Sequence, residues 1–124
     1  MTGEYIAVSG CTLAYSAPVT GPAPSLTSAP SVKVKVQGNG VYHDGDTVEI
    51  PVGITNGTCT STVVATGNIA ASATKVLADG KKVLRTNDSV TVSGITGVLS
   101  GGGGCTLSAT VTITNAGQTK VSGN

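Results

Sequence analysis

An internal repeat restricts the fold of this chain more than any other feature of its sequence. Residues 33–50 align with residues 75–92 without a gap, and six of the eighteen positions are identical. The identical pairs are Lys33/Lys75, Val34/Val76, Gly38/Gly80, Val41/Val83, Asp46/Asp88 and Val48/Val90. Self-similarity at a fixed spacing is typical of folds that stack one supersecondary unit several times. We therefore expect the two segments to form the same local structure.

The cysteines follow a similar rhythm. Cys11, Cys59 and Cys105 each precede a threonine and follow a glycine at one or two positions, with spacings of 48 and 46 residues. This pattern predicts three copies, roughly 11–54, 59–97 and 105–124, of which the last is shortened. A chain of 124 residues is long enough for one ordinary domain and too short for two, so we expect a single domain over residues 1–124.

Each copy has the pattern of a strand, a tight turn and a second strand. Val and Thr favour pleated strands, and the Asn-Gly and Asp-Gly pairs adopt the positive φ angles of hairpin turns. Helical periodicity is absent apart from a short turn at 69–72. The predicted strands are 31–36, 41–50, 73–78, 83–85, 89–92, 107–114 and 119–122. The sequence therefore predicts an all-β fold.

Two segments interrupt this pattern. Residues 18–30 contain four of the five prolines, which cannot donate to a strand ladder, so we expect an extended surface loop there. Residues 101–104 are four glycines, which predict either a plain link or a place where backbones approach closely.

The composition excludes several classes of function. Only 10% of the residues are charged and the net charge is +1, which disfavours a nucleic-acid surface. Three tyrosines are the only aromatic residues, so a deep aromatic-lined pocket is not expected. One histidine and scattered serines offer no nucleophile–base pair, and we expect no enzymatic activity. The N-terminus lacks the pattern of a signal peptide, which predicts synthesis in the cytoplasm and export by another route.

Residues 76–88 read Val-Leu-Ala-Asp-Gly-Lys-Lys-Val-Leu-Arg-Thr-Asn-Asp. This stretch resembles the strand, glycine turn, Pro-Ala-Ala-Arg segment and following aspartate of PAAR proteins. These proteins cap the spikes of contractile phage tails, type VI secretion systems and related injection particles. The matched positions are Gly80 for the turn glycine, Lys82 for the proline, Val83 and Leu84 for the alanines, Arg85 for the arginine and Asp88 for the aspartate. Gly38, Val41 and Asp46 match the same frame in the earlier segment, whereas the family's proline and both alanines are absent here.

The resemblance implies a small conical β-prism of short strands with pseudo-threefold repeats. Its wide base would sit on a trimeric β-helical spike protein, with one molecule per trimer. Such a cap ends the open strand edges of the spike and sharpens it for membrane puncture. The implied partners are the spike, the target-cell membrane during passage and, as a further candidate, effector proteins, with no nucleic acid. The implied location is the tip of a virion tail or injection particle, delivered to the target-cell envelope.

Family members commonly hold a metal ion near the tip with histidines and cysteine. The candidate ligands here are Cys11, Cys59 and Cys105, with His43 or another group as the fourth ligand of a zinc or iron ion. Two alternatives stay open, which are buried free thiols and one disulfide with one free thiol. For His43, a solvated strand position competes with the ligand role.

The remaining charged residues indicate structural roles. Asp44, Asp46 and Glu49 lack the spacing of a calcium loop, and we interpret Asp46 and Asp88 as carboxylates that cap turns. Lys33, Lys35, Lys75, Lys81 and Lys82 are expected on a solvated face. The alternative function is a non-enzymatic surface-binding module, an adhesin or a carbohydrate-binding β-domain. Few aromatic residues are available for stacking on a sugar, which disfavours that alternative.

Overall fold

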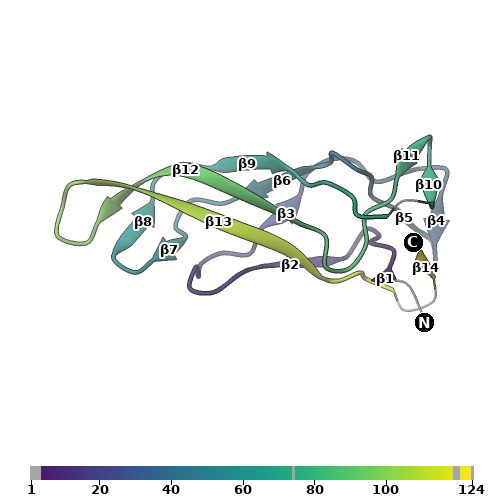
Figure 1. Ribbon diagram of the computed structural model, residues 1–124, viewed down its shortest axis with the longest axis horizontal. Helices are drawn as coiled ribbons and strands as arrows, with labels where there is room; N and C mark the ends of the chain where they lie inside the picture. Colours follow the sequence, from purple (N-terminus) through teal and green to yellow (C-terminus); the bar gives the residue numbers. More distant parts are fainter. Residues whose placement is uncertain (1–3, 74, 119–120, 124) are drawn as a thin grey trace.

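The structure is a computed structural model that describes residues 4–73, 75–118 and 121–123. This part of the chain contains strands and no helix, which confirms the predicted all-β class. The molecule is elongated, with both termini at one end and the turn between β12 and β13 at the other (Figure 1). The strands are β1 (Glu4–Tyr5), β2 (Thr12–Tyr15), β3 (Ser25–Leu26), β4 (Lys35–Val36), β5 (Asn39–Gly40), β6 (Thr47–Ile50), β7 (Thr55–Asn56), β8 (Cys59–Ser61), β9 (Ala65–Asn68), β10 (Leu77–Ala78), β11 (Lys81–Lys82), β12 (Ser89–Leu99), β13 (Gly104–Asn115) and β14 (Ser122–Gly123).

Three small hairpins with the same register form the end that carries the termini. In β4–β5, Lys35 pairs with Gly40, and in β10–β11, Leu77 pairs with Lys82. The third hairpin joins the two ends of the chain, because β1 pairs with β14. The repeat therefore has three copies, with β4 to β6 as the central copy and β10 to β12 as the C-terminal copy. Residues 4–15, completed by β14, form the N-terminal copy.

A closed ring of backbone hydrogen bonds joins the copies. The amide of Ala7 donates to the carbonyl of Leu84 at 2.9 Å, Leu84 donates to Tyr42 at 3.0 Å, and Tyr42 donates to Ala7 at 3.1 Å. A second set of three bonds surrounds this ring, with donors two residues after and acceptors two residues before its members. The bonds of the second set run from Ser9 to Gly40, from Asp44 to Lys82 and from Thr86 to Tyr5, at 2.9, 2.8 and 2.9 Å. These bonds share no residue and so do not close on themselves; the two sets are together called the rings. Two such sets with equivalent members define a pseudo-threefold axis through a single chain.

After these rings, the chain makes the same turn in each copy. The amides of Cys11, Asp46 and Asp88 each donate to the carbonyl three residues earlier. The residue before each of them has a positive φ: 98° at Gly10, 83° at Gly45 and 77° at Asn87. Strands β2, β6 and β12 begin directly after these turns, so Cys11, Asp46 and Asp88 are equivalent positions.

The strands that return toward the rings continue the threefold pattern. β3 pairs with β6, and β13 pairs with both β12 and β2. β9 pairs with β6 and packs against β12, where a Cβ on Gly67 would lie 2.8 Å from Val92 Cγ2. The copies differ mainly in the loop before the return strand. This loop is residues 16–24 in the N-terminal copy, contains β7 and β8 in the central copy, and becomes the outer halves of β12 and β13 in the C-terminal copy.

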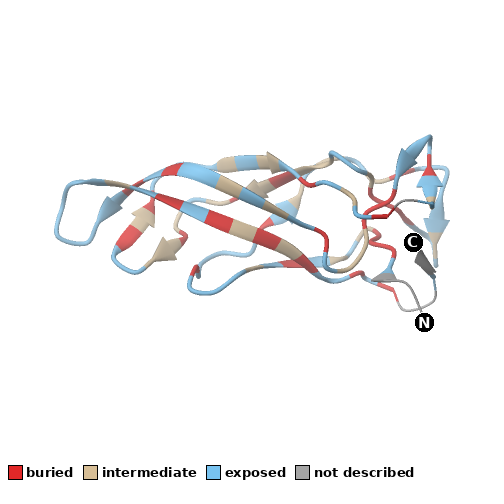
Figure 2. Cartoon of the chain, viewed as in Figure 1, coloured by how far each residue is buried: buried red, intermediate tan, exposed pale blue. Residues whose placement is uncertain are grey.

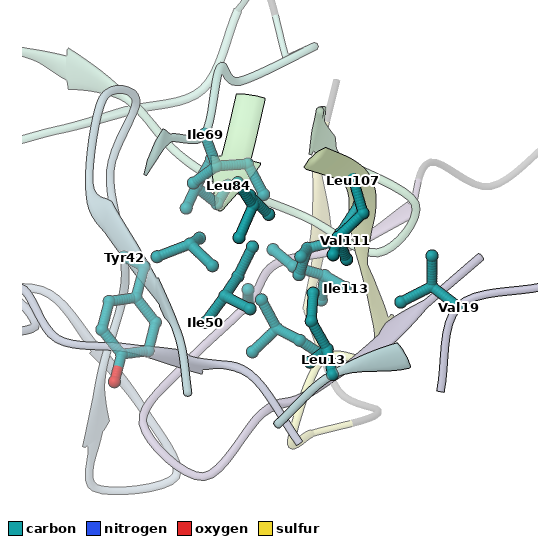
Figure 3. Packing of buried hydrophobic residues seen from close by; sticks show 14 of the residues in the cluster. Leu13, Val19, Tyr42, Ile50, Ile69, Leu84, Leu107, Val111 and Ile113 are labelled. Atoms are coloured by element: carbon teal, nitrogen blue, oxygen red, sulfur yellow. The ribbon is translucent and has the colours of Figure 1, made fainter. Parts of the chain in front are cut away.

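The rings separate two apolar clusters because alternate residues of a strand face opposite sides. Ile6, Val41 and Val83 belong to a small cluster beneath the hairpins. Their neighbours Ala7, Tyr42 and Leu84 belong to the main core, which also contains residues of β2, β6 and β13 (Figure 3). Burial is densest around the rings and becomes sparse toward the β12–β13 turn (Figure 2).

Several sequence predictions need correction. The register between 33–50 and 75–92 is observed, but the copies are not framed by the cysteines as 11–54, 59–97 and 105–124. Residues 107–114 do lie in a strand, β13. The C-terminal strand β14, however, pairs with β1 and not with β13. Residues 69–72 form no helical turn. The stretch 101–104 leads through the β12–β13 turn into β13, and a Cβ at any of its glycines would meet open space.

Candidate functional site

The three hairpins form one exposed surface, which we define as the terminal face (Figure 1). Gln37 and Gly38, at the turn of β4–β5, have φ angles of 53° and 84°, and Asp79 and Gly80 have φ angles of 54° and 80° at the equivalent turn. Positive φ at both central positions is the conformation of a two-residue hairpin turn that matches the strand twist. For the β1–β14 pair, the positions equivalent to these turns lie outside the described residues. Large apolar side chains are exposed here, namely Tyr5, Val32, Val34, Leu77 and Val121.

The lysines of the terminal face are solvent-exposed, as the sequence predicted. They are Lys33, Lys35, Lys75, Lys81 and Lys82. Lys33 and Lys75 occupy equivalent positions in the central and C-terminal copies. With Asp79 as the acid at a hairpin turn, the described part of this face carries an excess of positive charge.

His43 links two copies. Its Nε2 lies 2.9 Å from Oδ2 of Asp79, so a residue of the central copy contacts the hairpin turn of the C-terminal copy. Hydrogen bonds from Ser31 and His43 hold the pKa of Asp79 below its ordinary value. His43 is only partly exposed, and this carboxylate contact gives it a structural role between copies.

The predicted turn-capping carboxylates are confirmed. Oδ2 of Asp46 accepts the amide of His43 at 2.7 Å, and Oδ2 of Asp88 accepts the amide of Arg85 at 3.0 Å. Oδ1 of Asp88 also accepts the hydroxyl and the amide of Ser72. In the N-terminal copy Cys11 cannot provide this cap, and the amide of Val8 donates instead to the carbonyl of Ala116 at 2.9 Å.

The cysteines do not form the predicted three-thiolate site for zinc or iron. Cys59 and Cys105 form a disulfide with a Cα–Cα distance of 6.1 Å, and a disulfide sulfur is not a thiolate ligand. Cys11 is the free thiol and lies in the turn before β2, in the N-terminal copy, whereas His43 belongs to the central copy. Of the alternatives left open by the sequence, one disulfide with one free thiol is observed. The described residues contain no group of three His, Cys, Asp or Glu side chains placed to hold a metal ion.

Cys11 is expected to react slowly in the folded protein. Burial raises the pKa of its thiol to about 11, so less thiolate is present at a given pH. At pH 8 we expect alkylation by iodoacetamide to be about 100-fold slower than for a cysteine with the unperturbed pKa, and to reach the ordinary rate in urea. Mass spectrometry of the alkylated protein measures both rates. Equal rates in the native and unfolded protein would contradict the burial of this thiol.

The tyrosines do not form an aromatic platform on which a ligand could stack. Tyr42 is buried, and the hydroxyl of Tyr15 donates to the carbonyl of Pro22 at 2.6 Å, which leaves Tyr5 as the exposed tyrosine. No pocket opens on the described part of the chain. Within the same residues, no helix is long and apolar enough to cross a membrane.

Comparison with known proteins gives no relative from which a function could be transferred. No protein-family profile matches the chain, and neither a curated protein nor a solved structure matches it.

One property of the site was not predicted from the sequence, namely the distribution of charge along the chain. Every Asp, Glu, Lys, Arg and His lies at residue 4, within 33–49, within 75–88 or at residue 120. Those that the structure describes lie in the hairpins, in or beside the rings, and in the turns and strands that follow them. The signal was present in the sequence, but only the fold shows that it separates one end of the molecule from the other.

Proposed function

We propose that this protein is a structural cap that docks its terminal face on a threefold-symmetric partner. The observation that carries the proposal is the closed hydrogen-bond ring of Ala7, Tyr42 and Leu84, surrounded by three equivalent bonds that the amides of Ser9, Asp44 and Thr86 donate between the copies. A threefold axis within a single chain requires three segments with the same local structure. These segments arise either from one repeated unit or independently. A binding partner with the same symmetry gives a direct reason to keep that arrangement.

The partner that suits this face is a trimeric β-helical spike. Such a spike ends in three equivalent strand edges with unpaired backbone groups, which are prone to pair with other chains. Three hairpins around one axis can contact the three edges in the same way, and one molecule then closes one trimer. Exposed Val34 and Leu77 supply apolar contact area, and the neighbouring lysines favour an acidic rim on the spike.

The opposite end fits the role of a point. It consists of the β12–β13 turn and the β7–β8 hairpin (Figure 1), which we define as the distal end. The disulfide between Cys59 and Cys105 ties β8 to β13, and β12 lies between these two strands in the sheet. A narrow hairpin cross-linked to its neighbour resists bending better than an unbraced one. This geometry supports a cap that concentrates force for membrane puncture.

Native mass spectrometry with a trimeric spike protein from the same contractile system tests this proposal. We expect one molecule of the cap per spike trimer, with affinity that falls as salt rises because of the lysines. Leu77→Asp on the terminal face should abolish the complex, whereas Val98→Asp at the distal end should leave it intact. Three caps per trimer, or equal sensitivity to both variants, would refute docking through the terminal face.

A further inference from the structure

The distal end is free of charge. Residues 5–32, 50–74 and 89–119 contain no Asp, Glu, Lys, Arg or His. The first of these stretches includes β2 and β3, the second includes β7 to β9, and the third includes all of β12 and β13. Protein surfaces normally carry charges of both signs, which keep them soluble. A whole end without any charge therefore calls for a physical explanation.

Apolar side chains are exposed at this end. Val64 is 53% exposed and Val98 is 47% exposed. Val98 and Leu99 are consecutive in β12, so their side chains point to opposite faces of the strand, and both are exposed. Val52 and Val63, in the loops on either side of the β7–β8 hairpin, are exposed as well.

The backbone near the tip is already hydrogen-bonded. The amide of Leu99 donates to Gly103 at 3.0 Å, that of Gly102 donates to Leu99 at 2.9 Å, and that of Ser100 donates to Thr58 at 3.0 Å. Neutral hydroxyls occupy further positions of this end, and some of them pair with each other, as Thr55 of β7 does with Thr20 at 2.9 Å. When this end leaves water, no charge is desolvated and these amides keep their partners. The free-energy cost of entering an apolar medium is therefore low.

We infer that the distal end binds directly to lipid bilayers, by shallow insertion of the β12–β13 turn and its neighbouring valines. A protein partner would cover one face of the hairpin, whereas a bilayer surrounds an inserted tip, and exposed apolar residues lie on both faces here. The complete lack of charge favours the acyl region of the membrane over any ligand recognised by ion pairs. The inference rests on the proposed function only for the assignment of this end as the leading one, since lipid binding requires no spike.

The chain contains no tryptophan, so a single introduced indole reports on one position. Leu99→Trp places it at the distal end and Val32→Trp places it on the terminal face. With vesicles of neutral phosphatidylcholine, we expect brominated acyl chains to quench the indole at position 99 and not the one at position 32. Binding should be insensitive to salt, because no charge takes part.

Charge insertion provides the matched variants. Val98→Lys should weaken partition into neutral vesicles by about 100-fold, the effect of a charge placed in the hydrocarbon. Val32→Lys, at a more exposed position, should leave partition unchanged, and circular dichroism checks that both variants fold. Absence of quenching at position 99 would overturn the inference, as would binding restricted to anionic vesicles and lost in salt. Loss of spike binding with intact lipid binding would instead refute only the proposed function.

Discussion

Replacing Cys59 and Cys105 together by alanine is expected to lower the free energy of unfolding by about 4 kcal/mol. The disulfide joins residues 46 positions apart, and opening a loop of that length returns a large conformational entropy to the unfolded chain. The loss should be large relative to the total stability of a domain of this size. Urea denaturation followed by circular dichroism measures it, with the wild-type protein in oxidising buffer as the reference.

The matched control is Cys11→Ala, which removes a cysteine without removing a cross-link. We expect this variant to stay within about 1 kcal/mol of the wild type, and a reducing agent should destabilise it as much as it destabilises the wild type. The double variant should show no response to the reducing agent. A double variant as stable as Cys11→Ala would show that the cross-link contributes little to this fold.

The distal end depends on the disulfide more than the rings do. A Cβ on Gly97 would lie 2.5 Å from the carbonyl oxygen of Thr60 and 3.1 Å from Sγ of Cys59. The backbone of β8 therefore lies very close to that of β12, with which it pairs, and the disulfide joins β8 to β13 at this position. The rings, by contrast, lie between two apolar clusters. We expect the double variant to lose amide-exchange protection first in β7 and β8.

The sequence predicted the central and C-terminal copies because both keep the residues that the local backbone requires. Gly38 and Gly80 provide the positive φ of the hairpin turns, and Asp46 and Asp88 cap the turns that follow. A linear alignment detects these positions directly. The all-β class followed from the same turn chemistry, since the turns are spaced too closely for helices.

The N-terminal copy escaped detection for two physical reasons. Its hairpin is divided between the two ends of the chain, so no continuous segment contains it. Over residues 5–15 it also shares only Gly10 and Thr12 with the equivalent positions of the central copy. Backbone hydrogen bonds hold the rings, and these bonds do not depend on which side chains are present. One signal was available: Lys120-Val121 repeats the pairs Lys33-Val34 and Lys75-Val76.

The cysteine rhythm misled because its spacing is only similar to the 42 residues that separate the segments 33–50 and 75–92, and because it does not share the frame of the copies. Spacings of 48 and 46 residues resemble the repeat length, yet the three cysteines occupy different places in the fold. Cys11 lies in a turn, Cys59 is the first residue of β8, and Cys105 is the second residue of β13. Which sulfurs meet is decided by β12, which pairs with both β8 and β13. Such a contact depends on tertiary pairing, and residue spacing alone does not contain it.

The three equivalent turn positions predict a graded series of stability losses. Asp88→Ala is expected to lower the free energy of unfolding by about 3 kcal/mol, because a buried carboxylate that accepts several hydrogen bonds is removed and its donors lose their partner. Asp88 is 3% exposed and accepts from Arg85 and Ser72. Asp46→Ala should cost about 1 kcal/mol, since the bond from the amide of His43 is the main one lost. Cys11→Ala should cost least, because Ala116 already accepts the equivalent amide.

Urea denaturation of the three single variants measures this order, and Asp88→Asn separates the roles of charge and shape. Asparagine keeps one acceptor oxygen in nearly the same place, so we expect Asp88→Asn to retain part of the stability that Asp88→Ala loses. The ranking is specific to the pseudo-threefold arrangement, in which three equivalent backbone positions carry different side chains. Asp88 accepts several hydrogen bonds, Asp46 accepts mainly one, and Cys11 has no carboxylate. Equal losses at positions 46 and 88, or a loss at position 11 as large as that at 88, would contradict the assignment of these residues as equivalent caps with different partners.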